Sequence, residues 1–430
     1  MPPQPNSTRV RLGIVSLVSL VIANMVGAGV FTTSGLALAD LGSPHRVMLA
    51  WLIGGFVALC GALSYGALAK RITESGGEYV FLARLVHPLA GFLAGWVSLL
   101  AGFTAAIAFA ALAFETYTAR FLPMALPRGV IAVLVILLAM ALHGIRVQSG
   151  AFVQNGIVML KVGLMAVFLM FAWYAGLFSG SGSAPPPAPP FSARSFANVL
   201  VWISLSYSGF NAAVYVAGEA EQPARAVPRA LWLGTLMVTV LYLGLNAAFV
   251  YLPPFEQVVG RQDVAAAAAM SLGGDVLVVV VSGIIALALV TSVFSMMMAG
   301  PRVYARMADD GLFPRRFAFR GDAPRSAIGL QALLAVIVVL IADLKNLLSY
   351  LGLTLSLSAA ATVASLFLLR YREGAGSAVV WGFPFPPALF VGATLLFAAL
   401  AASRSPIELL AAVVTIASGC IAFAVFRRYQ

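Results

Sequence analysis

The sequence predicts an all-α membrane protein with twelve membrane-spanning helices, and three observations support this fold class. Hydrophobic residues make up 61% of the chain and charged residues only 10%, whereas soluble domains are about 45 to 50% apolar. Apolar segments near the length of about 20 residues that a bilayer requires recur along the whole chain. Basic residues gather in alternate loops. The candidate spans lie near residues 10–40, 47–69, 88–114, 129–145, 150–177, 195–218, 230–253, 275–301, 326–342, 346–369, 384–402 and 405–426.

The basic loops predict the orientation of the chain in the membrane. With the N-terminus in the cytoplasm, the arginines and lysines of 70–84, 225–229 and 302–325 lie on the cytoplasmic side, and fewer lie outside, as the positive-inside rule requires. An even number of spans then places both termini in the cytoplasm. The net charge of +11 comes from these short loops, which form no continuous basic patch. Nucleic acid is therefore not expected as a partner.

The start of the chain and its two cysteines bear on signal cleavage and on disulfide bonds. The polar start, Met1 to Thr8, leads into an apolar segment without a small-residue cleavage site, so no cleaved signal is expected. Cys60 and Cys420 both fall in apolar segments, which argues against a structural disulfide. The outer loop 115–128 has no cysteine, so we expect no disulfide-linked heavy subunit. The Ala/Pro-rich run 180–190 is predicted to be a short outer linker.

The first span carries a weak point at Gly27, Ala28 and Gly29, just after Asn24 and Met25. Glycine inside a helix costs about 1 kcal/mol relative to alanine, and its backbone leaves helical geometry without steric penalty. An interruption here would free N–H and carbonyl groups that lipid cannot satisfy. In a transporter the cargo can satisfy them. A close helix contact through small residues is the alternative interpretation.

The sixth span repeats this pattern between residues 206 and 211, where hydroxyls, a glycine and an amide stand in an apolar segment. Polar, non-helical backbone at membrane depth is tolerated where it lines a water-filled cavity. Corresponding interruptions in two halves of a chain are the best sequence indication of a transporter's binding site. The sequence therefore predicts a second broken helix.

Lys161 lies inside the fifth span, about 16 Å along the helix from Gly150 at 1.5 Å per residue. A charge near the membrane middle is by default a candidate functional residue. The alternative is a structural lysine bonded to helix carbonyls.

With these segments in view, the sequence resembles the amino acid-polyamine-organocation transporters. The matching motifs occur in the family's order and cover nearly the whole chain: Gly27 to Phe31, Leu63-Ser64-Tyr65 followed by Ser75 to Tyr79, Tyr207 to Asn211 with Gly218-Glu219 and Pro228 to Ala230, and Arg302 with Met307 to Pro314. The resemblance implies inverted repeats over residues 1–180 and 181–375, each of five spans, with spans eleven and twelve in 376–430. No residue-level repeat is visible in the sequence. Most residues of the loop 72–82 are interpreted as serving orientation and folding.

The resemblance also implies a binding site at the two interruptions. It places the α-carboxylate of an amino acid at the amides of Gly27, Ala28 and Gly29, since a helix N-terminus attracts anions, and the ammonium at the carbonyls of Met25, Leu205 and Ser208. Further lining residues are Ala94, Gly95, Leu99, Phe210 and Asn211, and the candidate gates are Tyr207, Phe210 and Phe294. No residue of this predicted pocket carries a charge, which favours an uncharged cargo. Asn211 stands where some arginine-exchanging relatives have an acid.

For Lys161, the resemblance implies an ammonium that replaces a sodium ion and reaches carbonyls near the first interruption. The sequence thus predicts a sodium-independent secondary transporter of uncharged amino acids in the bacterial cytoplasmic (inner) membrane, working by alternating access through exchange or proton symport. A cationic amino acid or polyamine is the alternative cargo. A channel and a membrane-embedded enzyme fit less well, because the interruptions are paired and no His-Glu-x-x-His pattern occurs. No cofactor or metal is expected.

The acidic residues outside the pocket are assigned structural roles. Glu219 and Glu221 lie beside Arg225 and Arg229 at the inner end of span six, and Asp309 and Asp310 lie among six arginines. Charge networks that close the cytoplasmic face are expected there. Glu115, near the outer end of span three, is expected in solvent, with a proton-coupling role as the lesser alternative.

Overall fold

The computed structural model describes residues 11–118, 126–145, 147–179, 187, 189–320, 323–341, 344–374, 380–402 and 406–428. In the first part of the chain the helices are α1 (Ile14–Met25), α2 (Gly29–Leu41), α3 (Pro44–Arg71), α4 (Glu78–Leu85), α5 (Pro88–Val97), η1 (Ser98–Ala105), α6 (Ala106–Thr118), α7 (Val130–Ile145) and α8 (Val147–Ser179). The remainder are α9 (Ala193–Ser206), η3 (Ala212–Glu219), α10 (Pro223–Tyr251), α11 (Phe255–Val258), α12 (Val264–Asp309), η4 (Arg315–Phe317), α13 (Arg325–Ile341), α14 (Leu344–Glu373), α15 (Phe385–Ala402) and α16 (Pro406–Arg428).

Eight helical segments in the described ranges are long and apolar enough to cross a bilayer, and shorter apolar helices occupy residues 130–144, 325–341 and 385–400. The chain is therefore a helical, multi-pass membrane protein. The count of twelve spans and the inverted repeat remain predictions. Both predicted boundaries, after residues 180 and 375, fall outside the described residues, as does most of the 180–190 linker.

The first predicted interruption is present. Helix α1 ends at Met25, Val26 leaves helical geometry at φ −81° and ψ 89°, and α2 begins at Gly29. Helices α1 and α2 therefore form one broken span. The packing of α10 against α1 and α3 holds the first half of this span in the bundle.

The second predicted interruption is also present. Helix α9 ends at Ser206, and the chain continues through turns to the 3₁₀-helix η3. Gly209 has φ +94°, and a Cβ there would lie 2.8 Å from the carbonyl oxygen of Asn24. Only glycine fits this position, because the conformation is left-handed and the backbone of the first broken span is so close.

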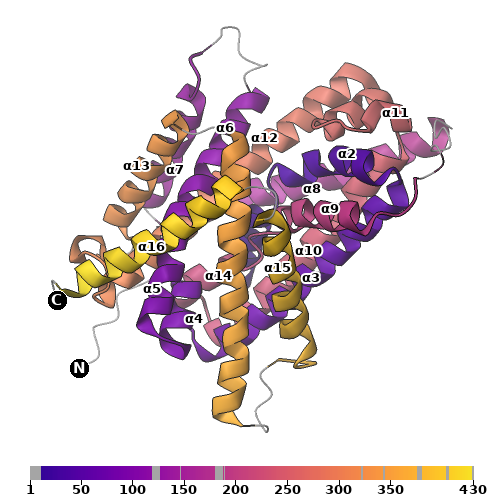
Figure 1. Cartoon of the computed structure of the whole chain (residues 1–430). Helices are drawn as coiled ribbons and strands as arrows, with labels where there is room; N and C mark the ends of the chain where they lie inside the picture. The colour runs from indigo at the N-terminus through magenta and orange to yellow at the C-terminus, as the bar shows by residue number, and fades with distance from the viewer. Residues whose placement is uncertain are drawn as a thin grey trace.

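Two irregularities in other spans were not predicted. A π-helix, η1, separates α5 from α6 in the third span. Helix α12 bends at Gly273 and Gly274, where Gly274 has φ +63°. Figure 1 shows the long α12 crossing the molecule behind α14, while α14 runs between α16 and α15, both of which it contacts.

One end of the bundle carries the charged connections between helices. This end, called the basic end below, consists of residues 70–87, 219–229 and 302–325, the segments predicted to face the cytoplasm. An isolated parallel bridge joins Leu12 to Ala220 there, with Leu12 N–H donating to the Glu219 carbonyl at 2.7 Å. The start of the first span is thus tied to the end of the sixth.

Candidate functional site

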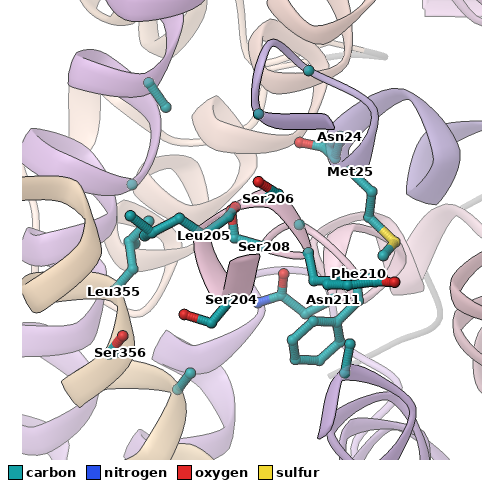
Figure 2. Close-up of a pocket in the computed structure, with 18 of the residues that line it drawn as sticks. Asn24, Met25, Ser204, Leu205, Ser206, Ser208, Phe210, Asn211, Leu355 and Ser356 are labelled. Carbon is teal, nitrogen blue, oxygen red and sulfur yellow. The ribbon is translucent and has the colours of Figure 1, made fainter. Parts of the chain in front are cut away.

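A cavity of about 370 Å³ lies between the two interruptions. A volume of this order suits a small ligand. Its lining comes from both broken spans and from α3, α4, η1, α6, α12, α14 and α15. Figure 2 shows Asn24 and Met25 of α1 above the turn that carries Ser208, Phe210 and Asn211. The two broken spans therefore open onto the same space.

The start of α2 presents backbone N–H groups to this cavity. Ala28 and Gly29 line it, and both are partly exposed. Within the described residues, neither amide donates to a backbone acceptor outside a helix, whereas Gly27 N–H donates to the Met25 carbonyl at 3.0 Å. The first N–H groups of a helix have no partner within it. The site thus offers hydrogen-bond donors and a positive helix end to an anion.

The ends of α1 and α9 are joined by one tyrosine. The hydroxyl of Tyr242 on α10 lies 2.6 Å from the Met25 carbonyl and 3.1 Å from the Ser206 carbonyl, and it is buried. Ser206 also contacts the second half of the first span, because its Oγ lies 3.3 Å from Thr33 Oγ1. Gly29 permits this approach: a Cβ at that position would lie 2.9 Å from Ser206 Cβ.

The three carbonyls predicted to bind the α-ammonium differ in how many hydrogen bonds they already accept. The Met25 carbonyl already accepts from Gly27 N–H and Tyr242, and the Leu205 carbonyl accepts from the N–H and hydroxyl of Ser208. The Ser208 carbonyl accepts none of the backbone bonds found outside helices in the described part of the chain. Of the three predicted carbonyls, the structure leaves that of Ser208 most accessible.

Nine of the predicted site residues lie together in the lining: Met25, Gly27, Ala28, Gly29, Leu205, Tyr207, Ser208, Phe210 and Asn211. The two aromatic residues among them are packed. Tyr207 is 2% exposed and donates to the Trp51 carbonyl at 3.1 Å, and the Phe210 ring packs against Tyr65 and Phe390.

Five predicted residues lie outside the lining, and one of them, Lys161, is buried against α12. Ala94, Gly95 and Leu99 are buried in helix contacts, and a Cβ at Gly95 would collide with Met307. The third span instead contributes residues further along, after it enters the π-helix: Gly102, Phe103, Ala106, Phe109 and Ala110. The gate candidate Phe294 is 4% exposed and its ring faces His143, with centroids 6.2 Å apart. These positions therefore support the walls of the bundle.

Lys161 is completely buried, and its ammonium donates to Thr291 Oγ1 on α12 at 2.8 Å. The next residue, Ser292, donates to the carbonyls of Ala23 and Val26 at the end of α1. Lys161 is therefore linked to the first interruption indirectly, through Thr291 and Ser292 of α12. A direct bond to those carbonyls, as the resemblance implies, is not among the interactions of Lys161 in the described structure.

The sequence interpretation missed Glu78, the one acidic residue in the cavity lining within the described chain. It is 4% exposed and accepts three hydrogen bonds: from Tyr65 at 2.8 Å, Asn211 at 2.9 Å and Tyr215 at 2.8 Å. Burial raises the pKa of Glu78 above its ordinary value, and these three bonds partly offset the rise. Gly76 and Gly77, with φ +128° and +60°, were the available signal, because they turn the chain so that Glu78 points into the bundle.

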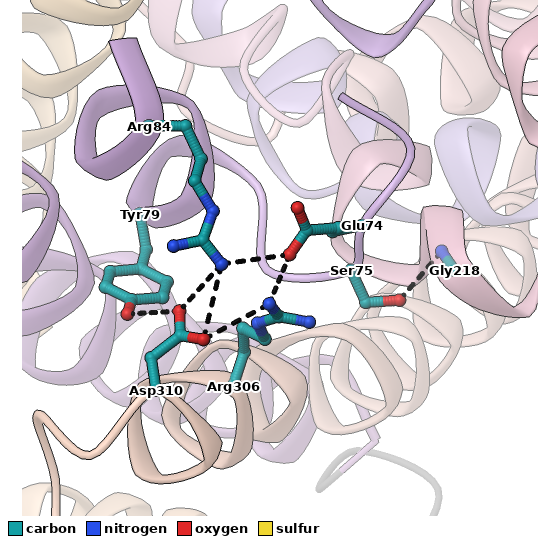
Figure 3. Close-up of polar contacts among 7 residues, drawn as sticks. All are labelled: Glu74, Ser75, Tyr79, Arg84, Gly218, Arg306 and Asp310. Atoms are coloured by element: carbon teal, nitrogen blue, oxygen red, sulfur yellow. Dashed lines mark hydrogen bonds and ion pairs between the residues drawn. The ribbon is translucent and has the colours of Figure 1, made fainter. Parts of the chain in front are cut away.

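Charged residues close the basic end next to the cavity (Figure 3). Asp310 accepts from Tyr79 at 2.7 Å and pairs with Arg84 at 3.3 Å and Arg306 at 3.1 Å, while Glu74 pairs with both arginines. The hydrogen bond from Glu74 raises the pKa of Arg84. Burial, with Asp310 adding to it, raises the pKa of Tyr79. The loop 72–82 therefore joins α12 through ion pairs and a hydrogen bond.

Glu219 takes part in a charge network at the basic end, as predicted, and its partner comes from α12. Its carboxylate pairs with Arg302 of α12, at 2.5 Å to Nε and 2.7 Å to Nη2, and not with Arg225 or Arg229. Arg302 is 1% exposed. The turn at the end of η3 directs Glu219 toward α12, away from the start of α10.

Glu115 was expected in solvent. Its carboxylate instead accepts from the N–H groups of Gly129 and Ala132 at 2.8 and 3.1 Å, so it caps the start of α7. Within the described residues, no group of three or more His, Cys, Asp or Glu side chains gathers as metal ligands.

Comparison with known proteins extends these observations. The sequence profile of the family described as "Amino acid permease" matches residues 12–425. The chain is 26% identical to the serine/threonine exchanger SteT of Bacillus subtilis (strain 168), over 86% of either chain. It is 24% identical to the human b(0,+)-type amino acid transporter 1, over 100% of this chain and 90% of the relative.

A third relative is the human large neutral amino acids transporter small subunit 2, 24% identical over 84% of this chain and 70% of the relative. The family and these relatives are transporters, which supports amino acid transport and excludes the enzyme alternative. The paired interruptions are those expected of such a transporter. The chain belongs to the amino acid permease family of amino acid-polyamine-organocation transporters.

Proposed function

We propose that this chain is a sodium-independent secondary transporter that moves uncharged α-amino acids across a bacterial cytoplasmic membrane by alternating access. The observation that carries the proposal is the meeting of two interrupted spans at one cavity, where α2 begins at Gly29 and α9 ends at Ser206. Helix ends at membrane depth expose N–H and carbonyl groups that need a polar partner. The backbone groups of a free amino acid supply both an anion and a cation.

The α-carboxylate is assigned to the N–H groups of Ala28 and Gly29 at the start of α2. Support comes from their position in the lining and from the donor capacity of a helix start. Gly27 contributes less, because its N–H already donates to Met25. The α-ammonium is assigned to the Ser208 carbonyl, because the carbonyls of Met25 and Leu205 each already accept two hydrogen bonds.

An uncharged side chain suits the remaining lining. A cationic amino acid or a polyamine would need a free carboxylate, and the two oxygens of Glu78 already accept three hydrogen bonds. Two of the relatives are named for serine and threonine and for large neutral amino acids. A cationic cargo remains the alternative, and the counterflow experiment below includes arginine for this reason.

We infer that the protein is a twelve-span transporter of two inverted repeats, and the contacts at its basic end favour an outward-facing state. Charge pairs and the Leu12–Ala220 bridge hold the basic end closed. The lining continues away from that end to Leu36, Phe109 and Phe397. If the positive-inside rule holds, the cavity faces the outside and both termini lie in the cytoplasm.

Sodium independence rests on Lys161. Its ammonium is buried against Thr291, whose neighbour Ser292 holds the end of α1. A fixed positive charge at this point would take the place of a bound cation in keeping the two segments together.

Counterflow in liposomes tests the proposal. Purified protein is reconstituted into vesicles loaded with each of the common amino acids in turn, and uptake of labelled L-serine, L-leucine and L-arginine is followed with sodium or potassium outside. We expect uptake of an uncharged amino acid to be accelerated by internal amino acid, to saturate, and to be equal in the two salts. An uptake rate that is the same with and without internal amino acid would indicate a channel. Dependence on sodium would contradict the role given to Lys161.

A further inference from the structure

Glu78 differs from Glu74, Glu219 and Asp310 of the basic end because it has no cationic partner in the described structure. Its oxygens accept from two tyrosines and one amide, all neutral donors. A buried carboxylate without a countercharge is costly in its ionised form, and hydrogen bonds repay part of that cost. Such a carboxylate is protonated more readily than one in solvent.

Four arginines on α4, α12 and α14 are engaged away from Glu78, and Lys70 and Arg71 at the end of α3 are exposed. On α4 itself and on α12, Arg84 and Arg306 pair with Asp310 and Glu74. On α12, Arg302 pairs with Glu219. On α14, Arg372 donates to the Leu85 carbonyl at 2.8 Å. The titratable groups that face Glu78 are Tyr65 and Tyr215, and Tyr304 of α12 interacts electrostatically with Tyr215.

The three donors to Glu78 come from two different spans. Tyr65 belongs to α3, and Asn211 and Tyr215 belong to the sixth span immediately after its interruption. The Gly77 turn brings α4 against Tyr215, because a Cβ at Gly77 would lie 3.1 Å from Cζ of that ring. Glu78 therefore ties the unwound part of the sixth span to α3 and α4.

Protonation would change this arrangement. An ionised carboxylate only accepts hydrogen bonds, whereas a protonated one must donate one. At least one of Tyr65, Asn211 and Tyr215 would then lose its acceptor or have to turn its own hydrogen away. Since Glu78 and Asn211 both line the cavity, a proton entering through the cavity can reach the carboxylate.

We propose that Glu78 is a proton-binding site whose ionised form holds the basic end closed and whose protonation releases the unwound segment of the sixth span. The proton binds from the side to which the cavity opens and leaves on the other side after the basic end opens. Among the two mechanisms compatible with the proposed transport, the site thus favours proton symport. The inference rests on the proposed function, because it assigns the ion that accompanies the amino acid.

The test compares vesicles with and without a pH gradient, acidic outside. Uptake of labelled L-serine and L-leucine is measured for the wild type, Glu78→Gln and Glu373→Gln. The last variant is the matched control, because Glu373 loses the same charge and pairs with Arg71 of the basic end, but it lies at the surface. The quantity compared is the ratio of initial uptake with the gradient to uptake without it.

We expect a ratio clearly above one for the wild type and Glu373→Gln, and a ratio of one for Glu78→Gln. A Glu78→Gln ratio equal to that of the wild type would overturn the inference and leave the proposed function standing. The inference would also be overturned, with the proposed function left standing, if the wild type shows counterflow but its uptake is the same with and without the pH gradient. Absence of counterflow for every amino acid in the wild type would contradict the proposed function and, with it, the inference.

A second variant covers the case in which Glu78→Gln does not fold. Tyr215→Phe removes one donor to the ionised carboxylate and keeps the ring. Hydrogen bonds to the charged form lower an acid's pKa, so their loss should move the midpoint of the pH dependence of uptake upward by roughly one pH unit. An unchanged midpoint would count against Glu78 as the titrating group.

Discussion

At the scale of single residues, the site depends on a few close approaches between the two broken spans. Gly29 and Ser206 touch, Gly209 lies against Asn24, and Tyr242 bonds the carbonyls of Met25 and Ser206. Each contact joins residues about 180 positions or more apart, except for Tyr242 with Ser206. The exposed backbone groups are therefore positioned by specific small residues and one hydroxyl.

Gly29→Ala should reduce counterflow by about tenfold or more. The added Cβ would lie 2.9 Å from Ser206 Cβ, and overpacking typically costs about 1–3 kcal/mol, where 1.4 kcal/mol corresponds to a tenfold change. Gly163→Ala is the matched control, because nothing lies within 4 Å of a Cβ there. The measurement is the initial rate of counterflow per folded protein. Equal rates for the two variants would contradict the placement of Gly29 in the site.

Lys161→Met should strongly reduce transport, and it should do so equally in sodium and in potassium. The change removes the buried ammonium that donates to Thr291. Thr291→Val leaves the ammonium in place but takes away this acceptor, so it should lower transport too, since an unpaired buried charge is costly. Initial rates in sodium and potassium are compared for both variants. Full activity of Lys161→Met would show that the lysine is dispensable.

How far the site could be predicted depends on whether its residues have a local signature. Gly27, Gly29 and Gly209 are visible because glycine and polar residues inside an apolar run indicate an interruption. Glu78 is not visible in this way, because its burial depends on Tyr65 and Tyr215 from distant parts of the chain. A carboxylate beside a charged loop looks solvent-exposed in sequence.

At the scale of secondary-structure elements, the 3₁₀-helix η3 is the piece that connects the site to the basic end. It begins one residue after Asn211 and ends at Glu219, which forms the ion pair with Arg302 of α12. The backbone of Glu219 also receives Leu12 N–H. Movement of η3 would therefore affect the cavity, α12 and the start of the first span together.

Arg302→Met should lower the thermal stability of the purified protein more than the double variant Arg302→Met/Glu219→Met. Removing one partner of a buried ion pair leaves an uncompensated charge and costs about 3–5 kcal/mol, whereas replacing both by apolar residues is often close to neutral. The midpoint of thermal unfolding in detergent is measured for the wild type and the three variants, including Glu219→Met. Additive losses in the double variant would mean that the two residues act independently.

The sequence predicted the elements that follow from hydropathy and composition, and it did not predict those that depend on local backbone geometry. The apolar runs gave the positions of the long helices, and the small and polar residues gave the two interruptions. The π-helix η1 has no distinct sequence pattern, and it brings Gly102, Phe103 and Ala106 to the cavity in place of Ala94, Gly95 and Leu99. The lining of the third span therefore had to come from the structure.

At the scale of the whole molecule, the basic end is closed by three separate sets of contacts. These are the bridge of Leu12 to Ala220, the ion pair of Glu219 with Arg302, and the cluster around Asp310 in Figure 3. The Glu78 contacts lie between these sets and the cavity. A cycle of alternating access would have to break them together, which is why a ligand-dependent or proton-dependent release is needed.

The central claim is that the two interruptions hold the backbone groups shared by amino acids, and protection of a nearby thiol tests it most directly. Thr32 lines the cavity one turn into α2. Thr32→Cys is made in a Cys420→Ala background, because Cys420 is exposed and Cys60 is buried. The labelling rate with a small thiol reagent is measured alone, with L-serine or L-alanine, and with ethanolamine or ethylamine, which lack the carboxylate.

The account predicts that at least one of the amino acids slows labelling of Thr32→Cys several-fold, while the corresponding amine does not. Labelling that is equally fast with and without amino acids, or that the amines slow as much as the amino acids do, would contradict it.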